Sequence, residues 1–257
     1  MRDHLEHYRT RLKVKADINS CNRCPLGDSP HRVPFDGNTW TPKLVLLGEA
    51  PGASEAIAHR PFVGASGVYL DHMLAMAGTS REDVTIVNTV CCRPPDNRDP
   101  EWSEMAACGS HRLAQVNLAR TSFGLTLGRI PLALLTDIPG VSVGKEIDHG
   151  FWADEKFWIP TYHPAYALRN RGAESVIVNS IRRALQYVSG ELETPVDPKF
   201  PNYKVVDGML IKKHDTSLVP QKYLETWPVF LHREWVVFRH DPEMVRAAKD
   251  LRGQKLA

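Results

Sequence analysis

The segment that decides the fold covers residues 43–71 and reads KLVLLGEAPGASEAIAHRPFVGASGVYLD. It opens with a short apolar run at 43–47 that ends at Gly48, a pattern typical of a parallel strand buried on both faces. A loop rich in Gly, Pro and Ala follows, and an apolar stripe over 66–77 then predicts a helix. The order strand, loop, helix places this loop at the carboxyl end of a strand, where open α/β sheets bind their ligands.

The remainder of the chain continues this alternation. Further strands are expected at 84–90, 123–128 and 157–162, and further helices at 2–18, 101–118, 130–135 and 174–188. Alternating strands and helices imply a parallel sheet with helices on both faces. The fold class predicted is therefore α/β, a three-layer sandwich with a central parallel sheet of about four strands.

The composition is that of an ordinary globular protein. The chain has 257 residues, of which 42% are hydrophobic and 24% are charged, enough for one large domain with an appendage. A net charge of +2 permits a local basic patch for nucleic acid without requiring one. The N-terminus is charged and no apolar run is long enough to span a bilayer, so we expect a cytoplasmic monomer without membrane association.

The chain changes character after Gly190. Three prolines between 195 and 201 mark a linker, and a hairpin is expected at 203–211, a strand at 234–240 and a helix at 241–252. We therefore expect two units: a main domain over 1–190 and a small α+β extension of unknown role over 191–257.

Five cysteines suggest a metal centre. Cys21 and Cys24 form a C-x2-C knuckle, Cys92 ends an apolar strand, and Cys108 lies in a helical pattern. Disulfides are a poor explanation in a reducing compartment, and separate pairs of cysteines can supply four thiolates to one centre. Zinc and a [4Fe–4S] cluster both accept this ligation, and the spacing leaves the choice open, beside the alternative of buried, inert thiols.

Polar and aromatic residues gather where the predicted strands end. Glu49 and Asn88 end two strands, His163 follows another, and Phe62 sits in a tight Pro-Phe-Val-Gly turn. An asparagine reads an amide-like edge, a histidine can donate to a developing anion, and an aromatic ring stacks on a flat base. Together they suit a planar heterocycle that leaves as an anion, although each alone also fits a structural role.

Several segments together resemble one family, the iron–sulfur (family four) uracil-DNA glycosylases. The matching segments are GEAPG at 48–52 with Glu55, PFVG at 61–64 with Ser66 and Gly67, VNTV at 87–90 running into CRPP and Asn97, and TYHPAY at 161–166 with Leu168 and Arg169. Cys21, Cys24, Cys92 and Cys108 fall at the family's cluster-ligand positions. This resemblance implies a [4Fe–4S] cofactor, with Cys91 outside the ligand set.

The resemblance also implies a mechanism. A nucleotide is flipped out of DNA, Phe62 stacks on its base, and Asn88 reads the amide-like edge. His163 then donates to the base oxygen as the glycosidic bond breaks, while Glu49 and Asn97 orient water or stabilise the sugar cation. No lyase lysine is evident, so we expect a monofunctional glycosylase that leaves an abasic site.

DNA contacts are expected beside the pocket. Tyr166 or Leu168 would wedge into the base stack, Arg169 would meet a phosphate, and Ser66 with Gly67 would hold another at a helix N-terminus. The expected partner is DNA containing uracil or a modified base.

The chain departs from the family pattern beside the pocket. His59 replaces a usual glycine, and Ala56 replaces a usual acid after Glu55. We expect His59 to border the base, and the departures leave open a same-fold glycosylase for another modified base. A non-catalytic iron–sulfur DNA-binding module and a zinc-only structural protein are further alternatives.

Overall fold

The computed structural model describes residues 2–147 and 149–193 and, beyond these, only the backbone of four short strands. Its centre is a six-stranded sheet in the order β1-β3-β2-β4-β6-β5. The four inner strands run parallel, and the edge strands β1 and β5 pair antiparallel with β3 and β6. The predicted α/β class and its central parallel sheet are therefore confirmed.

The strands of the main sheet are β1 (Asp36–Gly37), β2 (Leu44–Gly48), β3 (Val84–Asn88), β4 (Phe123–Leu127), β5 (Phe151–Ala153) and β6 (Lys156–Thr161). The α-helices are α1 (Arg2–Asn19), α2 (Ala53–Ala58), α3 (Ala65–Met76), α4 (Trp102–Leu118), α5 (Arg129–Thr136), α6 (Val143–Glu146), α7 (Pro164–Arg169) and α8 (Gly172–Ser189). Short 3-10 turns lie at Pro25–Asp28, Arg81–Asp83 and Pro95–Asn97.

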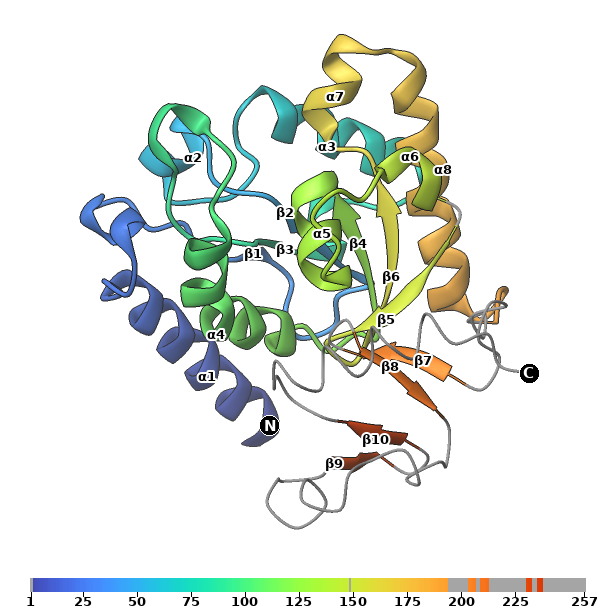
Figure 1. The fold of residues 1–257 in the computed structure, drawn as a ribbon, viewed down its shortest axis with the longest axis horizontal. Helices are drawn as coiled ribbons and strands as arrows, with labels where there is room; N and C mark the ends of the chain where they lie inside the picture. Colours follow the sequence, from blue (N-terminus) through green and yellow to red (C-terminus); the bar gives the residue numbers. More distant parts are fainter. Residues whose placement is uncertain are drawn as a thin grey trace.

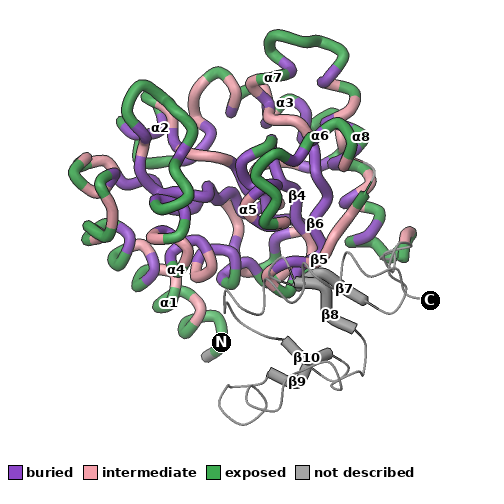
Figure 2. Tube along the Cα trace, in the orientation of Figure 1, coloured by how far each residue is buried: buried purple, intermediate pink, exposed green. Residues whose placement is uncertain are grey.

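Two apolar layers bury the sheet, one on each face. Along β2, Val45 and Leu47 pack with α1, α4 and α5, whereas Leu44 and Leu46 pack with α3 and α8. Successive side chains of a strand point to opposite faces, so a strand covered on both sides must be apolar throughout. The inner strands are buried along almost their whole length, and exposure is concentrated on the outer helices and loops (Figure 2).

The carboxyl ends of the parallel strands meet at one edge of the molecule. In Figure 1 β4 and β6 point toward this edge, where α2, α7 and the N-terminal end of α3 lie. Gly48 pairs with Asn88 across β2 and β3, and Leu127 pairs with Thr161 across β4 and β6, so the strands end at about the same level. The loops after them are thereby brought together.

Some elements were absent from the sequence-based expectation. Residues 53–58 form α2 inside the segment expected to be a loop, and β1 and β5 extend the sheet on both sides. These edge strands are only two and three residues long, too short for an alternating pattern to show. The last helix begins at Gly172, slightly earlier than expected.

The C-terminal part is described only as backbone strands. β7 (Tyr203–Val206) pairs antiparallel with β8 (Met209–Lys212), as the predicted hairpin requires, and β9 (Phe230–His232) pairs with β10 (Trp235–Val237). The helix expected at 241–252 lies outside the described residues. Among the helices described, none combines the length and apolar character needed to cross a bilayer.

Candidate active site

A strained turn presents Phe62 at the carboxyl edge of the sheet. Phe62 has a positive φ of 53° and is only 5% exposed. Such a backbone costs a residue with a side chain about 1 kcal/mol or more, so neighbouring contacts must hold it. The buried Glu55 does so, because its Oε1 accepts hydrogen bonds from the N–H groups of Val63 (3.1 Å) and Gly64 (2.9 Å).

Two further contacts hold the same turn from outside. The guanidinium Nη2 of Arg81 donates to the carbonyl of Pro61 at 2.5 Å, directly before Phe62. On the other side, a Cβ added to Gly67 would stand 1.9 Å from the carbonyl oxygen of Phe62. Only a residue without a side chain permits this approach of α3 to the turn.

Asn88 lies beside Phe62 with an unused hydrogen-bond acceptor. It ends β3, is 4% exposed, and its Oδ1 has no hydrogen-bond partner among the described residues. Gly48 of the neighbouring strand makes room: a Cβ there would stand 2.5 Å from Asn88 Oδ1 and 2.6 Å from the Phe62 ring. A buried polar atom without a partner is costly, which marks Asn88 as a group that a ligand would satisfy.

His163 completes the group and is poised as a neutral donor. Its ring centroid lies 5.6 Å from that of Phe62. The N–H of Ala165 donates to His163 Nδ1 at 3.1 Å, which leaves the ring proton of a neutral imidazole on Nε2. Burial, with a smaller contribution from the Arg169 charge, lowers the pKa of His163 to about 4. The imidazole is therefore neutral at physiological pH, with Nε2–H available as a donor.

Glu49 stands at the end of β2 with an elevated pKa. Burial raises the pKa of this carboxyl group to about 7; the negative charge of Asp99 adds to the rise, and Arg129 opposes it. Arg129 and Asp99 form an ion pair next to it. Asn97 is exposed on the same loop as Asp99, has a positive φ of 55°, and accepts a hydrogen bond from Arg93 Nε at 2.8 Å. Asn97 is thus not held among Phe62, Asn88 and His163.

One residue expected near the base, His59, and one expected to hold a phosphate, Gly67, have other contacts. His59 caps α2 with a left-handed backbone, its Nδ1 lies 3.0 Å from the carbonyl oxygen of Arg32, and its ring centroid lies 5.5 Å from that of His31. Gly67 is buried, and its N–H donates to the carbonyl of Gly64, so this group is already used within the helix terminus. Its neighbour Ser66 is half-buried at the start of α3.

The helix after His163 carries the expected DNA-contacting residues. Leu168 is 48% exposed and Tyr166 41% exposed on α7, and Arg169 is exposed at its end. Tyr166 packs on Tyr162 and accepts a hydrogen bond from Asn170 at its hydroxyl oxygen. Leu168 has the more exposed apolar side chain of the two.

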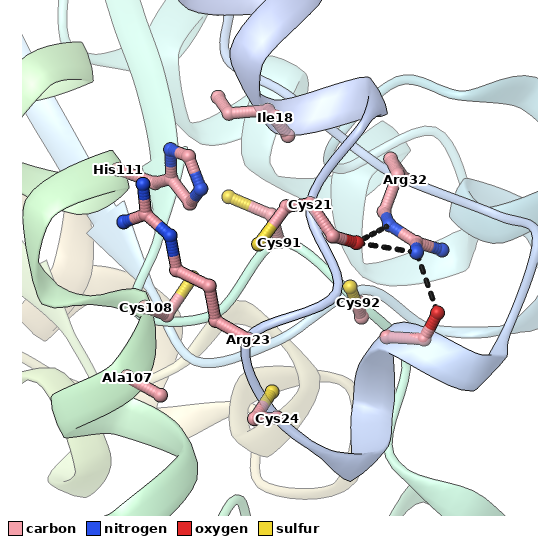
Figure 3. Close-up of a pocket in the computed structure, with 11 residues that line it drawn as sticks. Ile18, Cys21, Arg23, Cys24, Arg32, Cys91, Cys92, Ala107, Cys108 and His111 are labelled. Carbon is pink, nitrogen blue, oxygen red and sulfur yellow. Dashed lines mark hydrogen bonds between the residues drawn. The ribbon is translucent and has the colours of Figure 1, made fainter.

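The cysteines line one cavity formed by the loop after α1, the end of β3 and α4 (Figure 3). Cys21, Cys24, Cys92 and Cys108 all border it, together with Cys91. Arg32 holds the first loop in place, because its Nη2 donates to the carbonyls of Cys21 (2.6 Å) and Gly27 (2.5 Å). All five cysteines are free thiols.

The thiols around this cavity could hold a [4Fe–4S] cluster. Within the described part of the chain, no three His, Cys, Asp or Glu side chains converge as ligands of one ion. A cluster binds one thiolate at each of its four irons, so its ligands surround a larger object instead of meeting at a point. Tetrahedral zinc requires such a meeting point.

The sequence reasoning did not anticipate the structural roles of several residues of this site. Gly48 and Gly67 act through the space that they leave, Arg81 anchors the Phe62 turn, and Asp99 and Arg129 set the charge near Glu49. The only local signal was the glycine that ends the apolar run before Glu49. Apart from the approach of Gly67 to Phe62, the other contacts join segments distant in sequence.

The sequence is similar to one group of known proteins. Residues 34–186 match the model of the uracil DNA glycosylase superfamily. A type-4 uracil-DNA glycosylase of Thermotoga maritima is 38% identical over 185 residues, which is 69% of this chain and 94% of that protein. Another, of Saccharolobus solfataricus, is 34% identical over 69% of this chain and 86% of its own length. The chain therefore belongs to the type-4 uracil-DNA glycosylases of the uracil-DNA glycosylase superfamily.

Proposed function

We propose that this protein is a monofunctional DNA glycosylase that removes uracil from DNA. Water adds to the sugar carbon as the N-glycosidic bond breaks, so uracil leaves with the bonding electron pair and an abasic site remains. One observation carries the proposal: the unpartnered Asn88 Oδ1 lies beside the Phe62 ring, which faces the neutral donor His163. A stacking surface, an amide reader and an anion stabiliser are the groups that this reaction needs.

Base recognition assigns a role to each of these residues. The flipped base stacks on Phe62, and Asn88 accepts from the base N–H through Oδ1 while its amide N–H₂ donates to a base carbonyl. The same asparagine would face two mismatched groups on cytosine, because cytosine has an amino group and a ring acceptor in place of the carbonyl and N–H. Leaving buried polar groups unpaired in this way costs about 1–3 kcal/mol each.

His163 stabilises the leaving base. Negative charge grows on the base oxygen as the glycosidic bond stretches, and Nε2–H donates toward it. Because Nδ1 is occupied by the N–H of Ala165, the ring cannot adopt the other neutral tautomer without losing that bond. A preorganised donor of this kind is worth about 3–4 kcal/mol in other enzymes.

Glu49 acts on the opposite side of the bond that breaks. As a carboxylate it stabilises the positive charge on the sugar and orients the attacking water; Asn97 assists from the neighbouring loop. Since the pKa of Glu49 is raised to about 7, the active carboxylate forms only as the pH rises through neutrality.

DNA binding uses the surface around this edge. Leu168, or Tyr166 beside it, fills the gap left by the flipped base, and Arg169 and the N-terminal end of α3 at Ser66 meet phosphates. Ile57 and Val68 are also strongly exposed, at 76% and 66%, on α2 and α3. They extend the apolar surface available to an unstacked base.

The cofactor that we propose is a [4Fe–4S] cluster held by Cys21, Cys24, Cys92 and Cys108. When bound, it cross-links three segments of the chain through metal–thiolate bonds. Loops near the DNA-binding edge gain rigidity from this, and the role is structural. Zinc is the alternative, distinguished by iron analysis and by the brown colour of a cluster.

The end of α8 supports a division of the chain into two domains. We propose that residues 1–190 form the glycosylase domain, because α8 ends at Ser189 and Gly190 turns the chain in a left-handed conformation. Residues 191–257 then form an extension of unassigned role. We further propose that the protein acts as a monomer in the cytosol, where its free thiols remain reduced.

Oligonucleotides with one defined base test the function. Uracil, thymine, cytosine or a modified pyrimidine is placed at the same position in single and double strands, and alkali reveals abasic sites after incubation. We expect cleavage at uracil by the wild type and a loss of about 100-fold or more in His163→Ala. A matched control is His149→Ala, which alters an exposed histidine.

The outcomes separate the candidate functions. Cleavage at another pyrimidine but not at uracil would identify a same-fold glycosylase of different specificity. The departure at His59 gives little support to that reading, since its imidazole faces Arg32 and His31. Tight binding without cleavage of any base would establish a non-catalytic DNA-binding module instead.

A further inference from the structure

One buried histidine beside the cysteines has no use in the mechanism above. His111 lies on α4, one turn after Cys108, and lines the same cavity as the proposed cluster ligands (Figure 3). Its side chain is buried, with 6% exposure, and Nε2 has no hydrogen-bond partner among the described residues. The backbone carbonyl of His111 is already bonded to Gln115 Nε2 at 3.0 Å, which anchors this turn of the helix.

An unpaired imidazole nitrogen in a buried site needs a partner. Leaving such a group unsatisfied costs about 1–3 kcal/mol, and native proteins leave few of them. The cavity that His111 lines is the one bordered by four candidate thiolate ligands, and sulfur bearing negative charge accepts hydrogen bonds. Hydrogen bonds to sulfur are one of the means by which proteins set the reduction potential of an iron–sulfur cluster.

We propose that His111 donates a hydrogen bond from Nε2 to a sulfur atom of the bound cluster or of its cysteine ligands. This inference rests on the proposed [4Fe–4S] centre and assigns His111 a positioning and tuning role, not a catalytic one. The four cysteines occupy the four irons, so the imidazole acts as a donor and not as a fifth ligand. An added electron increases the negative charge on the sulfurs, and a donor stabilises that reduced form.

The sign of the effect on the reduction potential follows directly. Removing the donor destabilises the reduced cluster relative to the oxidised one, so the midpoint potential falls. His111→Phe keeps a flat ring of similar size without nitrogen, whereas His111→Gln keeps an N–H donor. His149→Phe is the matched control, because His149 is exposed and bonds to the Lys145 carbonyl, outside the cysteine cavity.

The experiment uses the full-length protein purified without oxygen. Iron content, visible absorbance and the midpoint potential of the one-electron couple are measured for each variant, and Fe–S vibrations are compared in H₂O and D₂O. We expect wild-type iron content throughout, a lower potential for His111→Phe, an intermediate one for His111→Gln, and no change for His149→Phe. A deuterium shift of the Fe–S vibrations should persist in the wild type and weaken in His111→Phe.

Each contrary outcome is informative. Equal potentials in the wild type and His111→Phe, with iron retained, would overturn the proposal. Loss of iron from both His111 variants while they remain folded would make His111 a ligand and also overturn it. Should His111→Phe fail to fold, magnetic coupling between the reduced cluster and ¹⁵N-labelled histidine in the wild type decides, and its absence would refute the hydrogen bond.

Failure of this inference is distinguishable from failure of the proposed function. Uracil excision is measured on the same preparations, and a structural cluster predicts little change in excision for His111→Gln. Protein that contains zinc but removes uracil would overturn the proposed role of His111 and support the proposed glycosylase function. Protein that shows the shift in midpoint potential but removes no base would support the role of His111 and overturn the proposed glycosylase function.

Discussion

Gly67 and the backbone of Phe62 approach each other so closely that only a residue without a side chain fits at position 67. A Cβ at Gly67 would stand 1.9 Å from the carbonyl oxygen of Phe62 and 2.7 Å from its Cα, in a turn where Phe62 has a positive φ. The position of the stacking ring thus depends on a close backbone approach between α3 and the preceding turn.

The first prediction concerns this approach. In Gly67→Ala the turn must move, so we expect a loss of about 1–3 kcal/mol in the free energy of unfolding and at least about a tenfold fall in kcat/KM. Chemical denaturation and single-turnover kinetics measure the two effects. Gly140→Ala is the control, because an added Cβ there meets nothing within 4 Å. Unchanged kinetics in Gly67→Ala would show that the Phe62 turn does not set the rate.

The second prediction separates stability from activity at Asn88. Replacing it by Leu removes a buried acceptor that has no partner among the described residues, a group whose burial costs about 1–3 kcal/mol. We therefore expect Asn88→Leu to unfold at no lower denaturant concentration than the wild type, while excision of uracil falls about 100-fold. A clear loss of stability would mean that the amide is satisfied within the native protein.

The third prediction is a pH profile set by Glu49. Its pKa is raised to about 7, so the carboxylate forms as the pH rises and kcat/KM should increase up to neutrality before levelling. Asp99→Asn removes a negative charge that raises this pKa and should move the rise to lower pH. In Glu49→Gln we expect low activity and no increase of kcat/KM with pH. A rise that persists in Glu49→Gln would assign it to another group.

The same shift has a consequence for folding. The folded pKa of Glu49 lies above its ordinary value, so between about pH 4.5 and 7 the unfolded state binds fewer protons at this position. Its contribution to stability is present at low pH and is lost as the pH rises through 7. Glu49→Gln should consequently gain stability relative to the wild type above neutral pH, as measured by denaturant melts across the range.

The fourth prediction concerns His163, whose shift has the opposite sign. Its pKa is lowered to about 4, so the imidazole stays neutral and no limb near pH 6.5 should appear in the rate profile. Between about pH 6.5 and 4 the unfolded state takes up a proton that the folded state does not, and stability falls as the pH falls. Selective ¹⁵N NMR of the ring should show protonated Nε2 at pH 7; protonated Nδ1 would contradict the donor role.

The fifth prediction distinguishes Cys91 from its neighbour Cys92. Both border the cavity, but Cys91 accepts a hydrogen bond from Gln115 Nε2 at 3.3 Å and is not one of the proposed ligands. Cys91→Ala should retain the iron content and brown absorbance of the wild type, whereas Cys92→Ala should lose both. Loss of iron in Cys91→Ala alone would reverse the assignment.

Local patterns in the sequence were sufficient to predict the fold class and the central parallel sheet. The apolar runs at 44–47 and 84–87 and the glycine at 48 are local features, so they indicated the buried strands and where the strands end without coordinates. The cysteine spacing, also local, led to the prediction of a metal centre. The short edge strands and α2 carry too few residues for periodicity to reveal them.

The chemical state of the site was decided by tertiary structure alone. The elevated pKa of Glu49 arises from burial and from the charge of Asp99. The tautomer of His163 is set by the hydrogen bond from the N–H of Ala165. Asn88 and His111 each have an unpaired buried atom because the residues packed around them supply no hydrogen-bond partner. The contact of Ala165 with His163 is local in sequence, whereas the other features depend on solvent exclusion and on short distances between segments remote in sequence. The sequence indicates which groups meet at the edge of this sheet. Only the folded chain determines their protonation, their backbone strain and their unused hydrogen-bonding atoms.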